Sequence, residues 1–158
     1  MASTPGGAGE LELSAAARPE EIGSLRRALR DWLAGSGAGR DEVEDVSLAV
    51  GEALTNAVEH AYPDGQEGEL AVRARRERDG VVAVAVRDYG HGDWRTPPPG
   101  SGRGCGLGLM QRLMDSVEVS WTPKGTEVVL RRRLGRGGSA PGRWSRGDAP
   151  GRARAPVR

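Results

Sequence analysis

The six apolar residues of the run VVAVAV, at positions 81–86, most constrain the fold of this chain. A strand that is apolar at nearly every position is buried on both sides and lies in the middle of a sheet. Residues 69–77 before it alternate apolar and polar side chains, and the Asp-Gly pair at 79–80 is typical of a hairpin turn. We therefore predict an antiparallel hairpin whose second strand, residues 81–88, is central.

Two amphipathic segments precede this hairpin and predict helices. Residues 18–33 place apolar side chains on one face, with Pro19 in the first turn, where a proline is tolerated. Residues 41–60 repeat apolar positions every three or four residues, and we expect Asp41 with Glu44 to cap this helix. Further patterns predict a strand at 10–14, a helix at 106–114, and strands at 117–121 and 127–134.

The order of these elements predicts the fold class. Consecutive strands joined by short turns pair antiparallel, and the helices between them cover one face of the sheet. We expect an α+β fold, a two-layer α/β sandwich with a mixed, mostly antiparallel sheet and its helices on one face. The domain is expected at residues 10–134, between a flexible N-terminus at 1–9 and an Arg/Gly/Pro-rich disordered tail at 135–158.

Charge is distributed unevenly along the chain. Residues 131–158 hold nine Arg and one Asp, whereas residues 1–130 hold 14 Lys or Arg and 21 Asp or Glu. Because an acidic body repels nucleic acid, we expect no direct nucleic-acid contact from the folded part. An alternative hypothesis makes the basic tail itself a nucleic-acid or membrane-surface element, with binding that weakens steeply as salt is added.

The sequence shows no membrane span, no secretory leader pattern and no pair of cysteines. No stretch approaches the about 20 apolar residues of a membrane span, and the N-terminus has no basic segment followed by an apolar run. The single cysteine, Cys105, cannot form an internal disulfide. We therefore expect a cytoplasmic protein without a membrane partner.

Three polar residues recur along one face of the predicted helix at 41–60. Glu52 and Asn56 are one turn apart, and His60 follows one turn later. An amide oxygen can hold a hard cation such as Mg²⁺, and a carboxylate can orient or deprotonate a nucleophile. By itself the stripe also fits a solvated helix face.

Two glycine-containing segments follow. Asp88 ends the most apolar strand and precedes Gly90 and Gly92, so that an acid can accept a hydrogen bond from an exocyclic amine while the backbone approaches a flat ligand. An ordinary turn with an aspartate cap has the same sequence. The segment GSGRGCGLGL, at positions 100–109, opens into a helix; its amides and Arg103 are suited to cradle phosphate.

The last segment is Gly125-Thr126, at the start of a predicted strand. There the Thr126 hydroxyl is a candidate support for Asp88. A plain turn before a β-favouring threonine has the same pattern. The remaining histidine, His91, and His60 lack metal-ligand partners in the sequence, and we interpret them as a loop and a helix-end histidine.

Taken in this order, the four segments resemble the motifs of the GHKL ATPase superfamily, whose Bergerat fold has the element order predicted above. GEALTNAVEHAY, with Glu52, Asn56 and His60, matches the N-box of that superfamily. The first glycine box is matched by Asp88, Gly90 and Gly92, the second by GCGLGL, and the terminal Gly-Thr by Gly125 and Thr126. The resemblance spans about residues 10–134.

Within the superfamily, the stand-alone domain with GEALTNAVEHAY and GLGLMQRLMDSVEV is most similar to the bacterial anti-sigma-factor serine kinases. That resemblance implies an ATP-dependent serine/threonine protein kinase that sequesters a sigma factor and phosphorylates an anti-anti-sigma protein of the STAS type on serine. It also implies a homodimer. The alternative is a non-catalytic ATP-binding module that regulates by partner binding alone.

The resemblance also implies roles for individual residues, with ATP and Mg²⁺ as cofactors. Asn56 would ligate Mg²⁺, Glu52 would act as base or orient the attacking hydroxyl, and Asp88 would bind the adenine amine. The other expected nucleotide-binding residues are Gly90, Gly92, Arg103, Gly104, Gly106, Leu107, Gly108 and Thr126.

Overall fold

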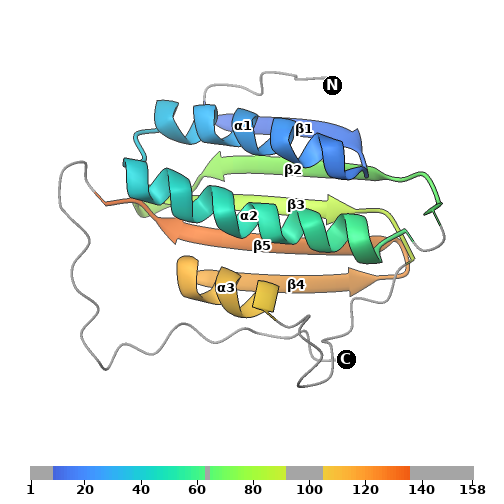
Figure 1. Cartoon of the computed structure of the whole chain (residues 1–158). Helices are drawn as coiled ribbons and strands as arrows, with labels where there is room; N and C mark the ends of the chain where they lie inside the picture. Colours follow the sequence, from blue (N-terminus) through green and yellow to red (C-terminus); the bar gives the residue numbers. More distant parts are fainter. Residues whose placement is uncertain (1–8, 63–64, 92–104, 136–158) are drawn as a thin grey trace.

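The computed structural model describes residues 9–62, 65–91 and 105–135. Five strands form one sheet in the order β1-β2-β3-β5-β4, and three α-helices lie across one of its faces (Figure 1). The two-layer α+β sandwich is confirmed, but the sheet is not mixed as predicted, because each of the four strand pairings in the described residues is antiparallel. The elements are β1 (Glu10–Ala16), α1 (Pro19–Gly35), α2 (Arg40–His60), β2 (Glu69–Arg76), η2 (Arg78–Gly80), β3 (Val81–Asp88), α3 (Cys105–Leu113), β4 (Ser116–Thr122) and β5 (Gly125–Arg133).

The apolar strand β3 is central, as its sequence predicts. It has two strands on either side, and Val82, Val84 and Val86 are buried beneath the helices. The turn that leads into it contains Asp79 at φ 62° and Gly80 at φ 73°. Aspartate and glycine are the residues that tolerate this left-handed backbone, so the Asp-Gly pair explains the reversal of the chain.

Helix α2 is the largest contributor to the core. It buries nine residues, among them Ala49, Gly51, Ala53 and Ala57, whose small size lets the helix lie close to its neighbours. Helix α1 buries Leu25, Leu29 and Leu33 beside it, on the same side of the sheet (Figure 1). Among the described ranges, no helix is long and apolar enough to cross a membrane.

The start of α2 differs from the prediction. The expected cap of Asp41 with Glu44 is wrong, because the helix begins at Arg40 and the Gly39 amide donates to Glu42 Oε2 at 2.7 Å. Glu44 instead pairs with Arg30 of α1, which draws its carboxylate away from the helix terminus. Asp41 therefore lies inside the helix, and Gly39 is the N-cap.

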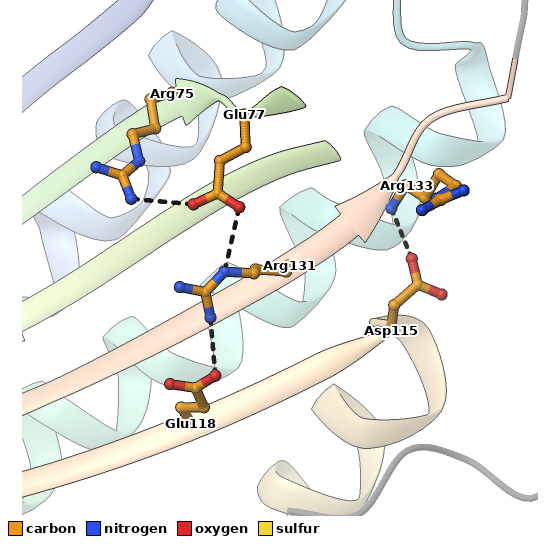
Figure 2. A network of polar contacts seen from close by, with 6 residues as sticks. All are labelled: Arg75, Glu77, Asp115, Glu118, Arg131 and Arg133. Carbon is orange, nitrogen blue, oxygen red and sulfur yellow. Dashed lines mark hydrogen bonds and ion pairs between the residues drawn. The ribbon is translucent and has the colours of Figure 1, made fainter. Parts of the chain in front are cut away.

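The opposite face of the sheet carries charged side chains in place of helices. Arg131 of β5 lies between two carboxylates, with Nε 3.4 Å from Glu77 Oε2 and a guanidinium nitrogen 2.9 Å from Glu118 Oε1. Arg75 pairs with the other oxygen of Glu77 at 3.0 Å. Figure 2 shows this chain of ion pairs crossing the strands in front of the helices. Such exposed pairs contribute little stability individually, but they keep this face polar.

Arg132 connects the C-terminal end of α3 to α2. Arg132 of β5 donates to the carbonyl oxygen of Leu113, at the end of α3, and pairs with Asp45 of α2 at 3.2 Å. Because the last carbonyl groups of a helix have no partner within it, this hydrogen bond also caps α3. The position of α3 relative to α2 is therefore fixed at its C-terminal end.

Two leucines of α2 test how the core depends on this helix. Leu54 has no exposed surface, whereas Leu48, six residues earlier, is 40% exposed. We expect Leu54→Ala to lower the free energy of unfolding by about 2–5 kcal/mol, because it removes apolar contacts and leaves a cavity. Leu48→Ala, measured by the same urea denaturation, is the control and should change stability by less than about 1 kcal/mol. Equal effects of the two substitutions would contradict the described packing of α2.

Candidate functional site

The structure brings together two residues of α2 and one glycine of α3. Glu52 and Asn56 are half-buried on successive turns of α2, and Gly106 lies in the first turn of α3. A Cβ atom at Gly106 would lie 3.2 Å from Glu52 Oε2 and 3.1 Å from Asn56 Nδ2. A larger residue would therefore crowd both polar side chains, and glycine keeps their functional atoms accessible beside the backbone of α3.

Asp88 forms a second part of the site, at the end of β3. Its side chain is only 3% exposed. One carboxylate oxygen, Oδ1, accepts hydrogen bonds from the amides of Gly90 and Thr126, each at 3.1 Å. Thr126 therefore supports Asp88 as predicted, but through its backbone amide and not through its hydroxyl group. In the described part of the chain both hydrogen bonds go to Oδ1, and none goes to Oδ2.

Burial raises the pKa of Asp88 above the ordinary value for aspartate, because a charged carboxylate loses solvation in the sheet. The hydrogen bonds from Thr126 and Gly90 act in the opposite direction, as does the charge of Arg87, but burial has the larger effect. Such a shifted, buried carboxyl group is typical of functional sites and makes Asp88 a candidate ligand-binding residue.

Glycine is required on both sides of Asp88 for close backbone approach. A Cβ atom at Gly90 would lie 1.9 Å from the carbonyl oxygen of Ala61, the residue that follows α2. A Cβ atom at Gly125 would lie 2.0 Å from the carbonyl oxygen of Asp88 itself, and Gly125 also has φ +127°. Any side chain at these positions would push β5 or the end of α2 away from Asp88.

The remaining predicted residues differ in what the structure shows of them. Leu107 packs against the core and so holds the start of α3 in place. Gly108 has open space where a Cβ atom would lie, with nothing within 4 Å. Predicted nucleotide-binding residues outside the described ranges are Gly92, Arg103 and Gly104.

Within the described residues, neither histidine makes a hydrogen bond or ion pair with Glu52 or Asn56. His60, at the end of α2, has Nε2 3.7 Å from Glu59 Oε2. The His91 ring Nδ1 lies at hydrogen-bond distance, 3.0 Å, from the carbonyl oxygen of Pro123. These partners agree with the interpretation of one helix-end and one loop histidine.

One residue with three contacts near Asp88 was missed by the sequence interpretation. The hydroxyl of Tyr62 bonds to both backbone groups of Glu69 and to the amide of Tyr89. The only local signal is a tyrosine between the end of a helix and a turn, which does not reveal partners seven and 27 residues away.

Comparison with known proteins identifies the family. A model of the histidine kinase-like ATPase domain matches residues 15–132, and the chain belongs to this family. The serine-protein kinase RsbW of Bacillus pumilus is 35% identical over 141 residues, which cover 80% of this chain and 86% of that protein. An anti-sigma F factor of Heyndrickxia coagulans is 31% identical over 136 residues, 79% of this chain and 91% of that protein.

A solved structure agrees with these relatives. The crystal structure of the RsbU and RsbW domains of a Mycobacterium tuberculosis protein matches with a TM-score of 0.66 and 29% identity. The match covers 80% of this chain and 33% of that longer chain. Together the comparisons confirm the resemblance inferred from the four motifs, and the names of the relatives agree with the predicted kinase and anti-sigma functions.

The raised pKa of Asp88 predicts how stability depends on pH. Because the folded protein retains the Asp88 proton to higher pH than the unfolded chain, ionisation costs stability. The contribution of Asp88 to the free energy of unfolding should therefore fall as pH rises from its ordinary pKa of 3.8 through the raised value in the folded protein. Urea denaturation across this range should show the fall in the wild type relative to Asp88→Asn. A difference that rises with pH, or a carboxyl carbon that titrates by NMR below 3.8, would contradict the effect of burial.

Proposed function

We propose that this chain is an ATP-dependent protein kinase that phosphorylates an anti-anti-sigma protein of the STAS type on serine, and that it sequesters a sigma factor. The observation that carries the proposal is the packing of Gly106 against both Glu52 and Asn56, which joins the helix of the N-box to the helix of the second glycine box. Relatives named serine-protein kinase and anti-sigma F factor support the same function. As in the branch that the chain resembles, we propose a homodimer that acts in the cytoplasm.

The adenine base is proposed to bind at the end of β3. Asp88 Oδ2 would accept a hydrogen bond from the exocyclic amine, while the amides of Gly90 and Thr126 hold Oδ1 in place. The close approach of the backbone at Gly90 and Gly125 leaves this carboxylate little freedom to turn. An orientation fixed before binding reduces the entropy lost when the base binds.

The phosphates are proposed to lie between α2 and the start of α3. Gly106, in the first turn of α3, would offer its backbone amide there, Gly108 leaves open space beside the backbone, and Leu107 holds this turn against the core. Gly92, Arg103 and Gly104 belong to the same proposed site through the motifs, although they lie outside the described ranges. Amides at the start of a helix suit an anionic ligand.

The residues beside Gly106 also fit a divalent metal. Asn56 offers an amide oxygen, a ligand that Mg²⁺ accepts, next to the carboxylate of Glu52. Mg²⁺, when bound with ATP, supplies positive charge to the phosphate oxygens.

Glu52 is proposed to act on the acceptor serine. Its carboxylate would orient the serine hydroxyl and accept its proton as the bond from Oγ to the γ-phosphorus forms and the bond from that phosphorus to the β,γ-bridging oxygen breaks. The half-buried position of Glu52 on α2 leaves it within reach of a bound partner. Of the three atoms nearest to a Cβ atom at Gly106, the one carboxylate oxygen belongs to Glu52.

The first test is nucleotide binding measured by calorimetry. We expect the wild type to bind ATP with Mg²⁺, and Asp88→Asn to weaken binding by roughly tenfold or more, because the amide places a donor where the base needs an acceptor. Asn56→Ala should remove most of the dependence on Mg²⁺. Asp79→Asn, in the exposed β2-β3 turn where asparagine tolerates the left-handed backbone, is the matched control and should bind as the wild type does. Absence of binding by the wild type would refute the nucleotide site.

The second test separates a kinase from a binding module. At saturating ATP, Glu52→Gln should slow phosphate transfer to serine by about 10²- to 10⁴-fold, the usual contribution of a general base. ATP affinity should be retained, since Glu52 has no proposed contact with the base or sugar. The control is Glu59→Gln, at an exposed position two turns after Glu52 on α2, which should transfer phosphate as the wild type does. Full activity of Glu52→Gln would remove its proposed role, and ATP binding without transfer by the wild type would favour the non-catalytic module.

A further inference from the structure

The hydroxyl group of Tyr62 connects the end of α2 to two strands of the sheet. It donates a hydrogen bond to the carbonyl oxygen of Glu69, the first residue of β2, at 2.6 Å. It accepts one from the amide of Glu69 at 3.1 Å and one from the amide of Tyr89 at 2.9 Å. A hydroxyl has one proton to donate and two lone pairs to accept, so this group is fully engaged.

The residues next to this hydroxyl are packed equally closely. A Cβ atom at Gly68 would lie 2.1 Å from Cζ of the Tyr62 ring, so only glycine leaves room for the ring there. Ala61, the residue before Tyr62, has its carbonyl oxygen 1.9 Å from the position of a Cβ atom on Gly90, the residue after Tyr89. Residues 61–62 and 89–90 therefore meet in two adjacent contacts, which we call the 62–89 joint.

Asp88 lies directly before the 62–89 joint. The amide of Tyr89 donates to Tyr62, and the next amide, that of Gly90, donates to Asp88 Oδ1. Because peptide groups are planar and leave only two rotations per residue, fixing the Tyr89 amide also restricts the direction of the Gly90 amide. The orientation of the Asp88 carboxylate thus depends on a hydroxyl that comes from the end of α2.

We infer that Tyr62 is a positioning residue for recognition of the nucleobase. Through Tyr89 and Gly90 it sets the direction in which Asp88 presents its second carboxylate oxygen to an exocyclic amine. The inference rests on the proposed function, because it takes the amine to be that of adenine. It adds to the site a residue that acts on the base through Asp88, and it links the end of the helix that carries Glu52 and Asn56 to the acid that selects the base.

A comparison of two nucleotides isolates this effect from general stability. ATP and purine riboside triphosphate share their sugar and phosphates, but the second lacks the 6-amino group. We expect Tyr62→Phe to weaken ATP binding by about five- to tenfold in calorimetry, the value of one misplaced hydrogen bond. Binding of purine riboside triphosphate should change by less than about twofold, because it makes no bond to Asp88.

Tyr89→Phe provides a matched control. The chain has two tyrosines, and this substitution removes the same hydroxyl from a side chain that is 45% exposed and stacks with Arg87. Its amide, the group that Tyr62 holds, is unchanged. We expect Tyr89→Phe to bind both nucleotides as the wild type does, and an equal selective loss in both variants would overturn the inference.

Other outcomes discriminate between the inference and the proposed function. Suppose that the wild type binds ATP, and that Tyr62→Phe weakens the binding of both nucleotides equally or of neither. Tyr62 then has no part in base recognition, while the proposed function stands. If the wild type binds neither nucleotide, the proposed function fails, and the inference with it.

Amide hydrogen exchange followed by NMR tests the joint without a nucleotide, and also serves if Tyr62→Phe does not fold. The Tyr89 amide should exchange slowly in the wild type, because it is bonded to Tyr62, and at least about tenfold faster in Tyr62→Phe. Rapid exchange of this amide in the wild type would overturn the inference.

Discussion

The site depends on the close packing of α2 against the sheet. This helix carries Glu52 and Asn56, ends beside Asp88, and faces the start of α3, so its position sets the spacing of every part of the site. Its buried face is rich in alanine, valine and glycine, which bring the helix close to its neighbours. A bulkier buried face would move the helix outward, and the polar stripe would then lose its contact with Gly106. The packing of α2 in the core therefore also determines the positions of Glu52 and Asn56 in the candidate site.

Burying Asp88 carries an electrostatic cost. Burial raises the pKa of the carboxyl, and two backbone amides offset only part of the lost solvation. One of these amides is that of Gly90, just after β3, and the other is that of Thr126 in β5. The carboxylate therefore links two neighbouring strands at one end of the sheet. A ligand that donates a hydrogen bond to Oδ2 would recover part of this cost. Under the proposed function, Asp88 at the end of β3 would therefore favour a ligand that donates a hydrogen bond to it.

The periodicity of the sequence was sufficient for most of the fold. Alternation at residues 69–77 and the continuous apolar run at 81–86 predict β2 and β3 to within a residue, since burial on one side or two decides those patterns. Contacts between distant segments were not predictable. The cap of α2 is Gly39 with Glu42, and Glu44 pairs with the distant Arg30. Spacing alone also does not tell whether the hydroxyl or the amide of Thr126 faces Asp88. Tyr62 escaped notice for the same reason, because its partners are defined only in three dimensions.

Gly106 and Gly108 belong to one motif, but the structure requires a glycine at only the first of these positions. At Gly106 the requirement is steric and internal, because a side chain would press on Glu52 and Asn56. At Gly108 the chain itself imposes no such requirement, since the space where a Cβ atom would lie is open. Packing therefore explains the first glycine but not the second. Under the proposed function, the open space beside Gly108 would give a phosphate room to approach the start of α3, which is a reason for glycine that packing does not provide.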